Sequence, residues 1–432
     1  MAQNRLHFLF LNIGHFLDHL VMLVFATAAA LVLAGEWGLT YAALIPYATP
    51  GFIAFGVFSL PAGWLADRYG REAMIAVFFF GIGVTMLATA LATTPLEMAI
   101  GLFAVGLFAA IYHPVGLALV VAERAGMGMS LAINGVWGNL GVGSAALLTG
   151  VLIDAFGWQA AFIVPGLVSV AIGSAYIALF QDRIRGGAPR AAAAPSASSN
   201  RDQSTAAPGS ADSERIPIFD RASLIRLVLI IFFTTAVGSI IFQSTTFALP
   251  RVFEERLGGL AVTPTMIGWL AFIVFAVASL AQVAVGASLD RFGPRAVFLV
   301  VAAIQVVFFA IMPGLTDGAA LLVALLFMIG AFGQIPINDY MIGRTARSDL
   351  RASIYGVRYV VTFLVLAATL PLIAVVHATW GFDALFRMLS VAALALFTAV
   401  LFLPRRLPDA DALVAPVVRQ RAAASASAKA AT

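Results

Sequence analysis

The sequence has no cysteine and very little charge. Of its 432 residues, 11% are charged and 62% are hydrophobic. The lack of cysteine excludes disulfide bonds, thiolate metal sites and a cysteine nucleophile. The core of a soluble protein cannot bury so large an apolar fraction, so we expect lipid to surround most of the chain.

Lysine is nearly absent too. Lys429 is the sole lysine, and no G-x-x-x-x-G-K-[ST] segment occurs. The chain therefore lacks the loop with which P-loop proteins hold nucleotide phosphates. Transport of a substrate against its own concentration gradient would therefore have to be driven by the gradient of a second solute. We expect no enzymatic activity and no cofactor.

Twelve apolar runs of roughly 20 residues divide the chain, and this length crosses about 30 Å of hydrocarbon. The runs do not alternate polar and apolar residues as barrel strands do, and in lipid each segment must pair its own backbone groups. We therefore predict an all-α membrane protein with twelve transmembrane helices. They fall near residues 6–33, 42–66, 72–93, 96–121, 128–154, 158–180, 223–249, 264–288, 296–314, 318–343, 353–378 and 383–403.

The composition changes abruptly after the sixth run, to Ala, Pro, Ser, Gly and charge. Such a segment has too little apolar surface to offset the entropy lost on ordering. We predict four parts: an N-terminal six-helix bundle (1–180), a flexible cytoplasmic linker (181–222), a C-terminal six-helix bundle (223–404) and a disordered cytoplasmic tail (405–432).

The two halves repeat one design. Three pairs of landmarks recur 222 to 224 residues apart: Gly63 and Gly286, Pro114 and Pro336, and Gly157 and Gly381. Agreement of three separate landmarks indicates an internal repeat of two similar bundles.

A polar hairpin joins the second and third runs of each half. Gly63 stands one helical turn before Asp67, where a glycine permits close approach of a neighbouring helix. Gly70 permits a turn with positive φ that larger residues resist. The two hairpins contain Gly63, Asp67, Arg68, Gly70 and Arg71 in the first half, and Gly286, Asp290, Arg291, Gly293 and Arg295 in the second.

The repeated G-x-x-x-D-R-x-G-R pattern, with Pro294 inserted in its second copy, resembles the cytoplasmic loop signature of the major facilitator superfamily of transporters. The resemblance implies two six-helix bundles related by a pseudo-two-fold axis along the membrane normal, with a site near the midplane between them. It also implies that the hairpins gate the cytoplasmic face. We expect Asp67, and Asp290 in the other half, to accept from amides at the start of a helix in the opposite bundle.

The cations indicate the topology. Arg251, Arg256 and Arg387 fall on one side and Arg358 within the membrane, so the other 21 of the 25 cations lie on the opposite side. The positive-inside rule then predicts that both termini are cytoplasmic. We expect a multi-pass monomer of a bacterial inner membrane and no nucleic-acid partner. Polar residues in the first run, and its length, argue against a cleaved signal peptide.

Few ionisable residues lie deep in the runs, where each costs a few kcal/mol unless it faces a cavity or a partner. Asn12, His15, Asp18 and His19 share one face of the first predicted helix, and His113 lies at a similar depth in the fourth, so that His15 and His113 can meet. Because histidine titrates near neutral pH, we predict that this group binds and releases protons that drive transport.

Two alternatives remain for the same residues. They could hold the first and fourth helices together by hydrogen bonds, as polar residues in membrane bundles often do. Alternatively, His15, His19 and His113 could bind a transition metal, since histidines at this spacing are plausible ligands.

The second half contributes Asp339 and Arg358. An unpaired guanidinium is costly in lipid, so we predict a structural ion pair between them. The alternative is that Arg358 meets an anionic group of the substrate. Gln243 and Asn338 complete the residues that we expect near the central cavity.

The fifth run contains Gly135, Gly138, Gly141 and Gly143, at a spacing that permits close helix packing. This pattern also resembles the glycine-rich signature in the fifth helix of antiporters of the same superfamily, but without its proline. The direction of transport that the signature implies is therefore open.

Residues 15–19 (HFLDH) and 111–116 (IYHPVG) resemble the bacterial efflux branch that includes the fosmidomycin-resistance proteins. Together, these features predict a secondary transporter that exports a small organic compound, anionic or amphiphilic, in exchange for protons by alternating access. A carrier of a metal ion or metal chelate is the alternative within transport. A membrane sensor or assembly factor that keeps the fold without transporting is the alternative from another class.

Overall fold

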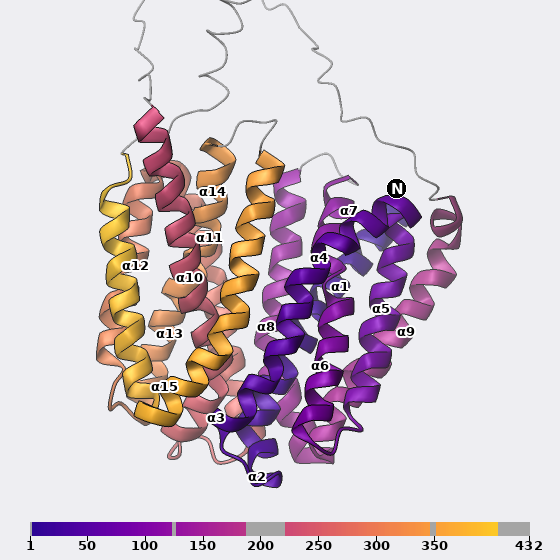
Figure 1. The fold of residues 1–432 in the computed structure, drawn as a ribbon, viewed down its shortest axis with the longest axis horizontal. Helices are drawn as coiled ribbons and strands as arrows, with labels where there is room; N and C mark the ends of the chain where they lie inside the picture. Colours follow the sequence, from indigo (N-terminus) through magenta and orange to yellow (C-terminus); the bar gives the residue numbers. More distant parts are fainter. Residues whose placement is uncertain (1, 123–126, 187–220, 346–350, 405–432) are drawn as a thin grey trace, which may run out of the picture.

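The structure, a computed structural model, describes residues 2–122, 127–186, 221–345 and 351–404, and every regular element in these ranges is a helix (Figure 1). Apolar runs become helices because lipid offers no partner for backbone N–H and C=O groups. The predicted all-α fold is confirmed. The predicted tail and residues 187–220 of the predicted linker lie outside the described residues.

Six spans form the N-terminal bundle, and short π or 3₁₀ turns continue some of the helices. They are span 1 (α1 Ala2–Ala28, η1 Ala29–Leu33, α2 Ala34–Glu36), span 2 (α3 Tyr41–Leu44, η2 Ile45–Ala48, α4 Thr49–Tyr69), span 3 (α5 Arg71–Thr89), span 4 (α6 Pro95–Ala109, η3 Tyr112–Gly116, α7 Leu117–Ala122), span 5 (α8 Met127–Phe156) and span 6 (α9 Trp158–Gly186).

The C-terminal bundle repeats this order. It consists of span 7 (α10 Arg221–Arg256), span 8 (α11 Pro264–Phe292), span 9 (α12 Pro294–Ile311), span 10 (α13 Asp317–Gly333 and α14 Ile335–Thr345) and spans 11 and 12 (α15 Arg351–Leu401).

Helix α15 contains two spans. Its apolar part Leu364–Leu401 has 38 residues, which is about 57 Å of helix and nearly twice the hydrocarbon thickness. Gly381 interrupts the helix with φ 72° and ψ −178°, a conformation that glycine adopts without strain. The 11 helices of membrane-crossing length among the described residues therefore make twelve spans, as predicted.

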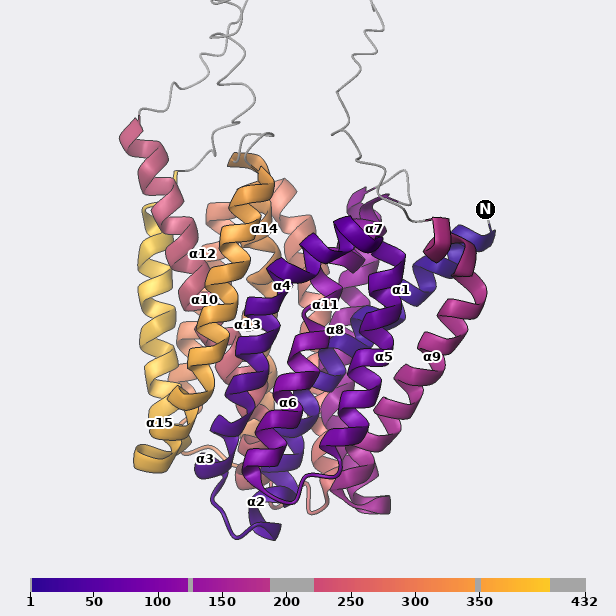
Figure 2. The same cartoon turned by 45° about the vertical axis from the view of Figure 1, so that its right-hand side comes forward.

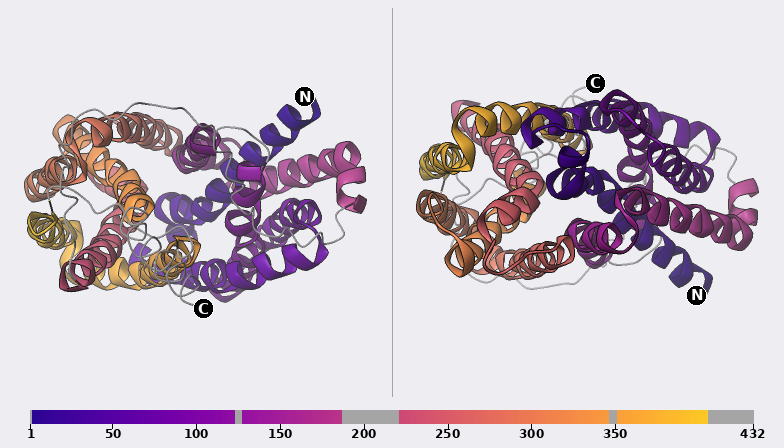
Figure 3. Two further views of the ribbon diagram at one scale, coloured as in Figure 1. Left: turned by 90° about the horizontal axis from the view of Figure 1, so that it is seen from above. Right: turned by 90° about the horizontal axis from the view of Figure 1, so that it is seen from below.

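The two bundles lie side by side, the first indigo to magenta and the second rose to yellow (Figures 1 and 3). They meet where α1 packs on α10, α8 on α11 and α4 on α15. The N-terminus, the end of α9 and the start of α10 lie at one face, which we call the N-terminal face (Figures 1 and 2). Helices α2 and α3 lie at the opposite face, which we call the distal face.

Spans 4 and 10 are interrupted at equivalent positions. Pro114 lies in the π turn η3, and Pro336 follows the break between α13 and α14. Proline lacks a backbone donor and disturbs the preceding turn. In each span, a side chain two residues before the proline bonds to a carbonyl of the first span of the same bundle. These bonds are Tyr112 Oη to the Leu11 carbonyl (2.6 Å) and Gln334 Nε2 to the Gly238 carbonyl (2.8 Å).

Both polar hairpins turn on a glycine. Gly70 has φ 99° and Gly293 has φ 78°, as their place in the repeated pattern predicts. Their amides close the preceding helices, with bonds to the carbonyls of Ala66 (2.9 Å) and Leu289 (3.0 Å). Each hairpin is thus a tight link between two spans.

Helix α9 extends further than predicted. The predicted linker begins at residue 181, but α9 continues through Gly186, with non-helical geometry only at Phe180 (φ −123°, ψ 21°). Arg183 gives this extension a partner, since it donates to Asn4 Oδ1 at 2.7 Å and lies 3.2 Å from His7 Nδ1. Helix α10 likewise begins at Arg221, before the predicted start at 223.

Candidate functional site

A cavity of about 240 Å³ lies between the bundles, with walls from both. We call it the central cavity. Its polar lining consists of Asp18, His19, His113, Thr235, Ser239, Gln243, Thr246, Gln334, Asn338, Arg358 and Thr362. Its apolar lining consists of Met22, Leu23, Phe52, Phe55, Val142, Gly238, Phe242, Phe247, Ile335 and Leu366.

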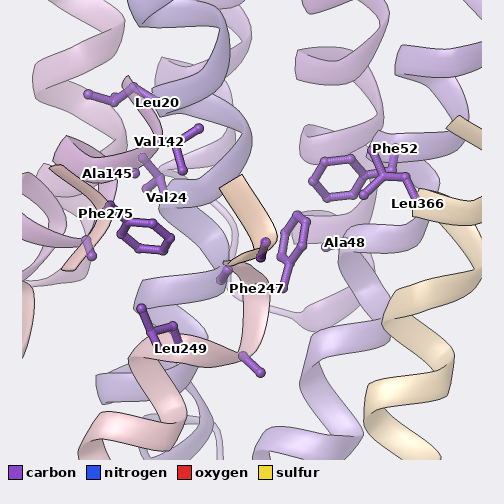
Figure 4. Close-up of a cluster of buried hydrophobic side chains, with 14 of the residues drawn as sticks. Leu20, Val24, Ala48, Phe52, Val142, Ala145, Phe247, Leu249, Phe275 and Leu366 are labelled. Atoms are coloured by element: carbon purple, nitrogen blue, oxygen red, sulfur yellow. The ribbon is translucent and has the colours of Figure 1, made fainter. Parts of the chain in front are cut away.

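Apolar side chains from both bundles close the cavity toward the distal face. Phe52 of α4 and Phe247 of α10 meet edge to face, with ring centroids 4.8 Å apart (Figure 4). Beside them, Figure 4 shows Val24 of α1, Ala145 of α8 and Phe275 of α11 packed together. Aromatic and aliphatic contacts of this kind exclude water from the distal end of the interface.

An acid and a base face each other on the wall of the N-terminal bundle. Asp18 of α1 has no exposed surface, and its Oδ2 lies 3.2 Å from Nδ1 of His113 in η3. A buried carboxylate without a partner would be costly in this setting, and the imidazole offsets that cost. Because both residues line the cavity, a proton can be exchanged between this pair and the cavity.

His15 and His19 form a second pair on α1. His15 Nδ1 lies 2.7 Å from the carbonyl oxygen of Asn134, which can only accept, so this nitrogen carries a proton. In a neutral ring, His15 Nε2 then accepts from Nε2–H of His19, 3.2 Å away. His19 lines the cavity while His15 lies behind it. The ring of His113 stands edge-on to both, at centroid distances of 5.4 and 5.5 Å.

A buried amide positions this cluster. Asn134 of α8 donates from Nδ2 to Asn12 Oδ1 and to Tyr112 Oη, both at 2.9 Å. The Tyr112 ring stacks on His15, with an interplanar angle of 19°. The bonds therefore tie spans 1, 4 and 5 together around His15, which is consistent with the predicted alternative of a structural role for part of the cluster.

The glycines of α8 explain how this helix comes so close. A Cβ at Gly138 would lie 2.7 Å from the ring of His15, and a Cβ at Gly141 would lie 2.2 Å from the carbonyl oxygen of Phe16. A Cβ at Gly143 would lie 3.2 Å from Cβ of Phe275, which belongs to the other bundle. The absence of a side chain at Gly138 and Gly141 thus allows α1 to pack closely on α8, while Gly143 faces α11.

The wall of the C-terminal bundle carries the predicted ion pair. Arg358 of α15 bonds to Asp339 of α14 and lines the cavity. Asn338 Oδ1 accepts from Thr234 Oγ1 at 3.1 Å. Gln334 Oε1 accepts from Gln305 at 2.9 Å, which fixes its orientation beside the cavity. The cavity therefore has one acid–base pair on each wall.

Six of the nine predicted cavity residues line the cavity: Asp18, His19, His113, Gln243, Asn338 and Arg358. Asn12, His15 and Asp339 do not. Asn12 and His15 lie behind the wall because both bond to Asn134. Asp339 is outside the lining, although its partner Arg358 belongs to it.

The aromatic part of the lining and two of the amides were not predicted from the sequence. Phe52, Phe55, Phe242 and Phe247 resemble the other phenylalanines of apolar runs, and nothing in the sequence separates them. Gln334 and Asn134 could have been found, because an uncharged amide inside an apolar run needs a partner just as an ionisable residue does.

The three histidines also suit a metal ion in part. One ring nitrogen from each of His15, His19 and His113 lies within 4.8 Å of the others. Tetrahedral zinc holds such nitrogens about 3.4 Å apart, at bond lengths of roughly 2.0–2.1 Å. A metal ion would have to break the bond between His15 and His19 and draw His113 closer. The present geometry fits a shared proton better.

The polar hairpins lie at the N-terminal face. Asp67 bonds to Arg71 of its own hairpin at 3.3 Å and its side chain is 70% exposed. The expected contact of Asp67 with a helix of the opposite bundle stays a prediction, because it belongs to a conformation in which the bundles meet at the N-terminal face. Asp290 is also exposed. A Cβ at Gly63 would lie 3.5 Å from Cβ of Pro114, so this glycine does admit span 4.

Curated relatives match the chain over about a third of their own length. A gallate transporter of Pseudomonas putida is 29% identical over 139 residues, 32% of this chain and 31% of the relative. A 4-hydroxybenzoate transporter of Pseudomonas aeruginosa is 28% identical over 148 residues, 34% of this chain and 33% of the relative. A tetracenomycin C resistance and export protein of Streptomyces glaucescens is 29% identical over 150 residues, 34% and 28% of the two chains.

Solved structures show the same fold at low sequence identity. A bacterial homologue of the human lysosomal transporter Spinster, inward-facing and unoccupied, superposes with a TM-score of 0.66 at 14% identity, over 93% of this chain and 94% of the other. A peptide transporter in complex with sulfate superposes with a TM-score of 0.68 at 15% identity, over 91% and 93% of the two chains.

The family profile matches almost the whole chain, over residues 11–260 and 231–426. The resemblance that the two hairpins carry is therefore confirmed, whereas the resemblance to the fosmidomycin-resistance branch stays a prediction. With two bundles of six spans and a cavity between them, this chain belongs to the Major Facilitator Superfamily.

Proposed function

We propose that this protein is a secondary transporter that exports a small organic compound in exchange for protons. The observation that carries the proposal is the central cavity with an acid–base pair on each wall, Asp18 with His113 and Asp339 with Arg358. Families with this fold work by alternating access around a site between the two bundles. Relatives named as transporters and as an export protein support transport rather than catalysis.

The lining supports a substrate that is anionic or amphiphilic. Arg358 offers a guanidinium that can bind a carboxylate or phosphate through two parallel bonds. The phenyl rings of Phe52, Phe55, Phe242 and Phe247 offer apolar and aromatic contacts. Relatives named for gallate and 4-hydroxybenzoate are consistent with this class.

The coupling ion in this proposal is the proton. Asp18 and His113 together hold one proton when the pair is neutral or zwitterionic, and a second when both are protonated. Protonation from the cavity would change the charge of the wall opposite Arg358, and with it the affinity for an anion. His19 links the pair to His15 and could pass the proton along α1.

The topology belongs to the same proposal. The N-terminal face would be cytoplasmic, the membrane would be a bacterial inner membrane, and the protein would work as a monomer. The two bundles would move as units on either side of the predicted linker. In that orientation, a structure joined at the distal face would correspond to the inward-open state. Asp67 and Asp290 would engage the opposite bundle when the N-terminal face closes.

A flux screen tests the proposal. The purified protein in liposomes is offered a panel of aromatic carboxylates, aliphatic carboxylates, neutral amphiphiles and divalent metals, with and without a pH gradient. We expect uphill movement of at least one carboxylate that a protonophore abolishes. If folded protein moves nothing on the panel, the sensor or assembly-factor alternative is favoured. If it moves only metals, the metal-carrier alternative is favoured.

A further inference from the structure

The bundles are joined at the distal face by two hydrogen bonds that cross in opposite directions. Asp154, near the end of α8, accepts at Oδ2 from the backbone amide of Thr265, 2.8 Å away at the start of α11. Arg251 of α10 donates from Nη1 to the carbonyl of Ala30 in η1, at 3.3 Å. Each bundle thus places one charged side chain on the backbone of the other.

Asp154 meets α11 at its most favourable point. The first amides of a helix have no partner inside the helix, and the aligned peptide dipoles make this end positive. Thr265 follows Pro264, the first residue of α11, so its amide is one of these free donors. The contact is of the type expected for Asp67, but it lies at the opposite face of the protein.

Close packing of α8 on α11 holds this contact in register. A Cβ at Gly150 would lie 2.3 Å from the carbonyl oxygen of Pro264, and a Cβ at Gly268 would lie 2.7 Å from that of Ala146. The two backbones therefore touch one turn before Asp154. A separation of the helices at this face would break the bond to Thr265.

Arg251 is held in place by its own bundle. Glu254 Oε2 lies 2.7 Å from its Nη1, and Glu255 Oε1 lies 2.9 Å from its Nε. Its guanidinium also lies 5.7 Å from the ring centroid of Tyr41 in α3, which belongs to the other bundle. The ring of Tyr41 in turn meets His377 of α15 edge to face. Glu254 and Glu255 therefore hold the Arg251 side chain in the orientation in which it contacts the N-terminal bundle.

We propose that Asp154 and Arg251 form a distal latch, a pair of positioning residues that holds the distal face closed while the central cavity is loaded. Asp154 binds an amide of the C-terminal bundle, and Arg251 binds a carbonyl of the N-terminal bundle. Both partners are backbone groups, so opening the latch leaves an amide and a carbonyl that water can satisfy. The latch is independent of what the cavity binds.

The chain supplies a matched control. Asp317 Oδ1 accepts from the amide of Gly259 at 2.9 Å, also near the distal face but within one bundle. Asp317→Asn therefore perturbs the same kind of bond without touching the interface. Thr265→Pro complements Asp154→Ala, because it removes the donating amide of the latch at a helix position where proline is tolerated and changes no charge.

Distance measurements between spin labels test the latch. Because the chain has no cysteine, labels can be attached to Leu91→Cys and Val262→Cys near the distal face, and to Tyr69→Cys and Phe292→Cys near the N-terminal face. All four side chains are at least 60% exposed. The two pairs report the opening of each face, without substrate and without transport.

We expect Asp154→Ala and Thr265→Pro each to raise the ratio of distal-open to distal-closed molecules by about 10- to 150-fold, as for a lost hydrogen bond to a charged group. Asp154→Ala combined with Arg251→Gln should raise it further, so that a long-distance population appears for the 91–262 pair and a shorter one for the 69–292 pair. Distance distributions of this double variant that coincide with those of Asp317→Asn would overturn the proposal.

Discussion

Asp18 and His113 meet across spans 1 and 4, with Oδ2 of one 3.2 Å from Nδ1 of the other, and both line the central cavity. On the opposite wall, Arg358 is paired with Asp339. The charges on the two walls are thus paired in this conformation, and exchange requires that the cavity hold the proton and the anion in turn.

The first prediction concerns the proton-binding wall. Asp18→Asn and His113→Gln keep the size of each side chain but prevent the pair from taking up a second proton. We expect both variants to fold and to lose at least tenfold of the uphill flux, while exchange of substrate at equal concentrations on both sides continues. Counterflow and gradient-driven uptake in liposomes, measured side by side, separate these two activities.

His15 provides the control for that experiment. It lies behind the cavity wall and bonds to the carbonyl of Asn134. His15→Asn should lower thermal stability more than it lowers the proton dependence of flux. Equal loss of coupling in the His15 and His113 variants would contradict the division between a structural and a proton-binding histidine.

The second prediction concerns the ion pair on the other wall. Arg358→Gln leaves Asp339 without its partner in the membrane, so we expect lower thermal stability and weaker membrane expression. Arg358→Gln combined with Asp339→Asn removes both charges and should restore stability. If Arg358 also binds the substrate anion, the double variant stays inactive toward carboxylates. A thermal-shift assay measures the effect on stability, and a flux assay measures the effect on transport.

The third prediction tests the packing of α8 on α1. Gly138→Ala would place a methyl group 2.7 Å from the His15 ring. Overpacking of this size costs about 1–3 kcal/mol, so the melting temperature should fall. Gly135→Ala is the matched control, because a Cβ at that position has nothing within 4 Å. A control variant that is as unstable as Gly138→Ala would contradict the assignment of the clash.

The fourth prediction concerns metals. Because His15 and His19 bond to each other in the present geometry, we expect no saturable zinc binding that depends on His113. Isothermal titration of the purified protein with zinc, compared with His113→Ala, measures it. Stoichiometric binding that the substitution abolishes would favour the metal-carrier alternative.

Much of the fold could be predicted because its causes are local. Run length predicts the spans, and the repeated hairpins predict both the family and the positive φ of Gly70 and Gly293. The kink at Gly381 coincides with the boundary expected between spans 11 and 12. In each case, the sequence neighbours of a residue are also its neighbours in space.

The site was predictable only in part because it is assembled from distant segments. Residues of α1 share a helix face, so Asp18 and His19 could be grouped from spacing alone. That Asn134 would turn Asn12 and His15 away from the cavity depends on how α8 packs, which spacing does not show. Asp154 was missed for a similar reason: an aspartate at a helix end resembles an ordinary surface residue until its partner in α11 is known.

The partner of Asp67 depends on conformation as well as on sequence. Asp67 bonds to Arg71 of its own hairpin here. The fifth prediction is that Asp67→Asn inserts normally into the membrane but transports less, because the closed state of the N-terminal face is weakened. Flux normalised to the amount of inserted protein tests it, and unchanged flux would count against a gating role for the hairpin.

Proton movement driven by substrate tests the central claim most directly. Liposomes that contain the protein and a pH-sensitive dye are given an outward gradient of a transported carboxylate, with no pH gradient at the start. We predict that protons enter as the carboxylate leaves, and that Asp18→Asn removes the proton signal while the protein stays folded. Efflux of the carboxylate with no change in internal pH in the wild-type protein would contradict proton exchange.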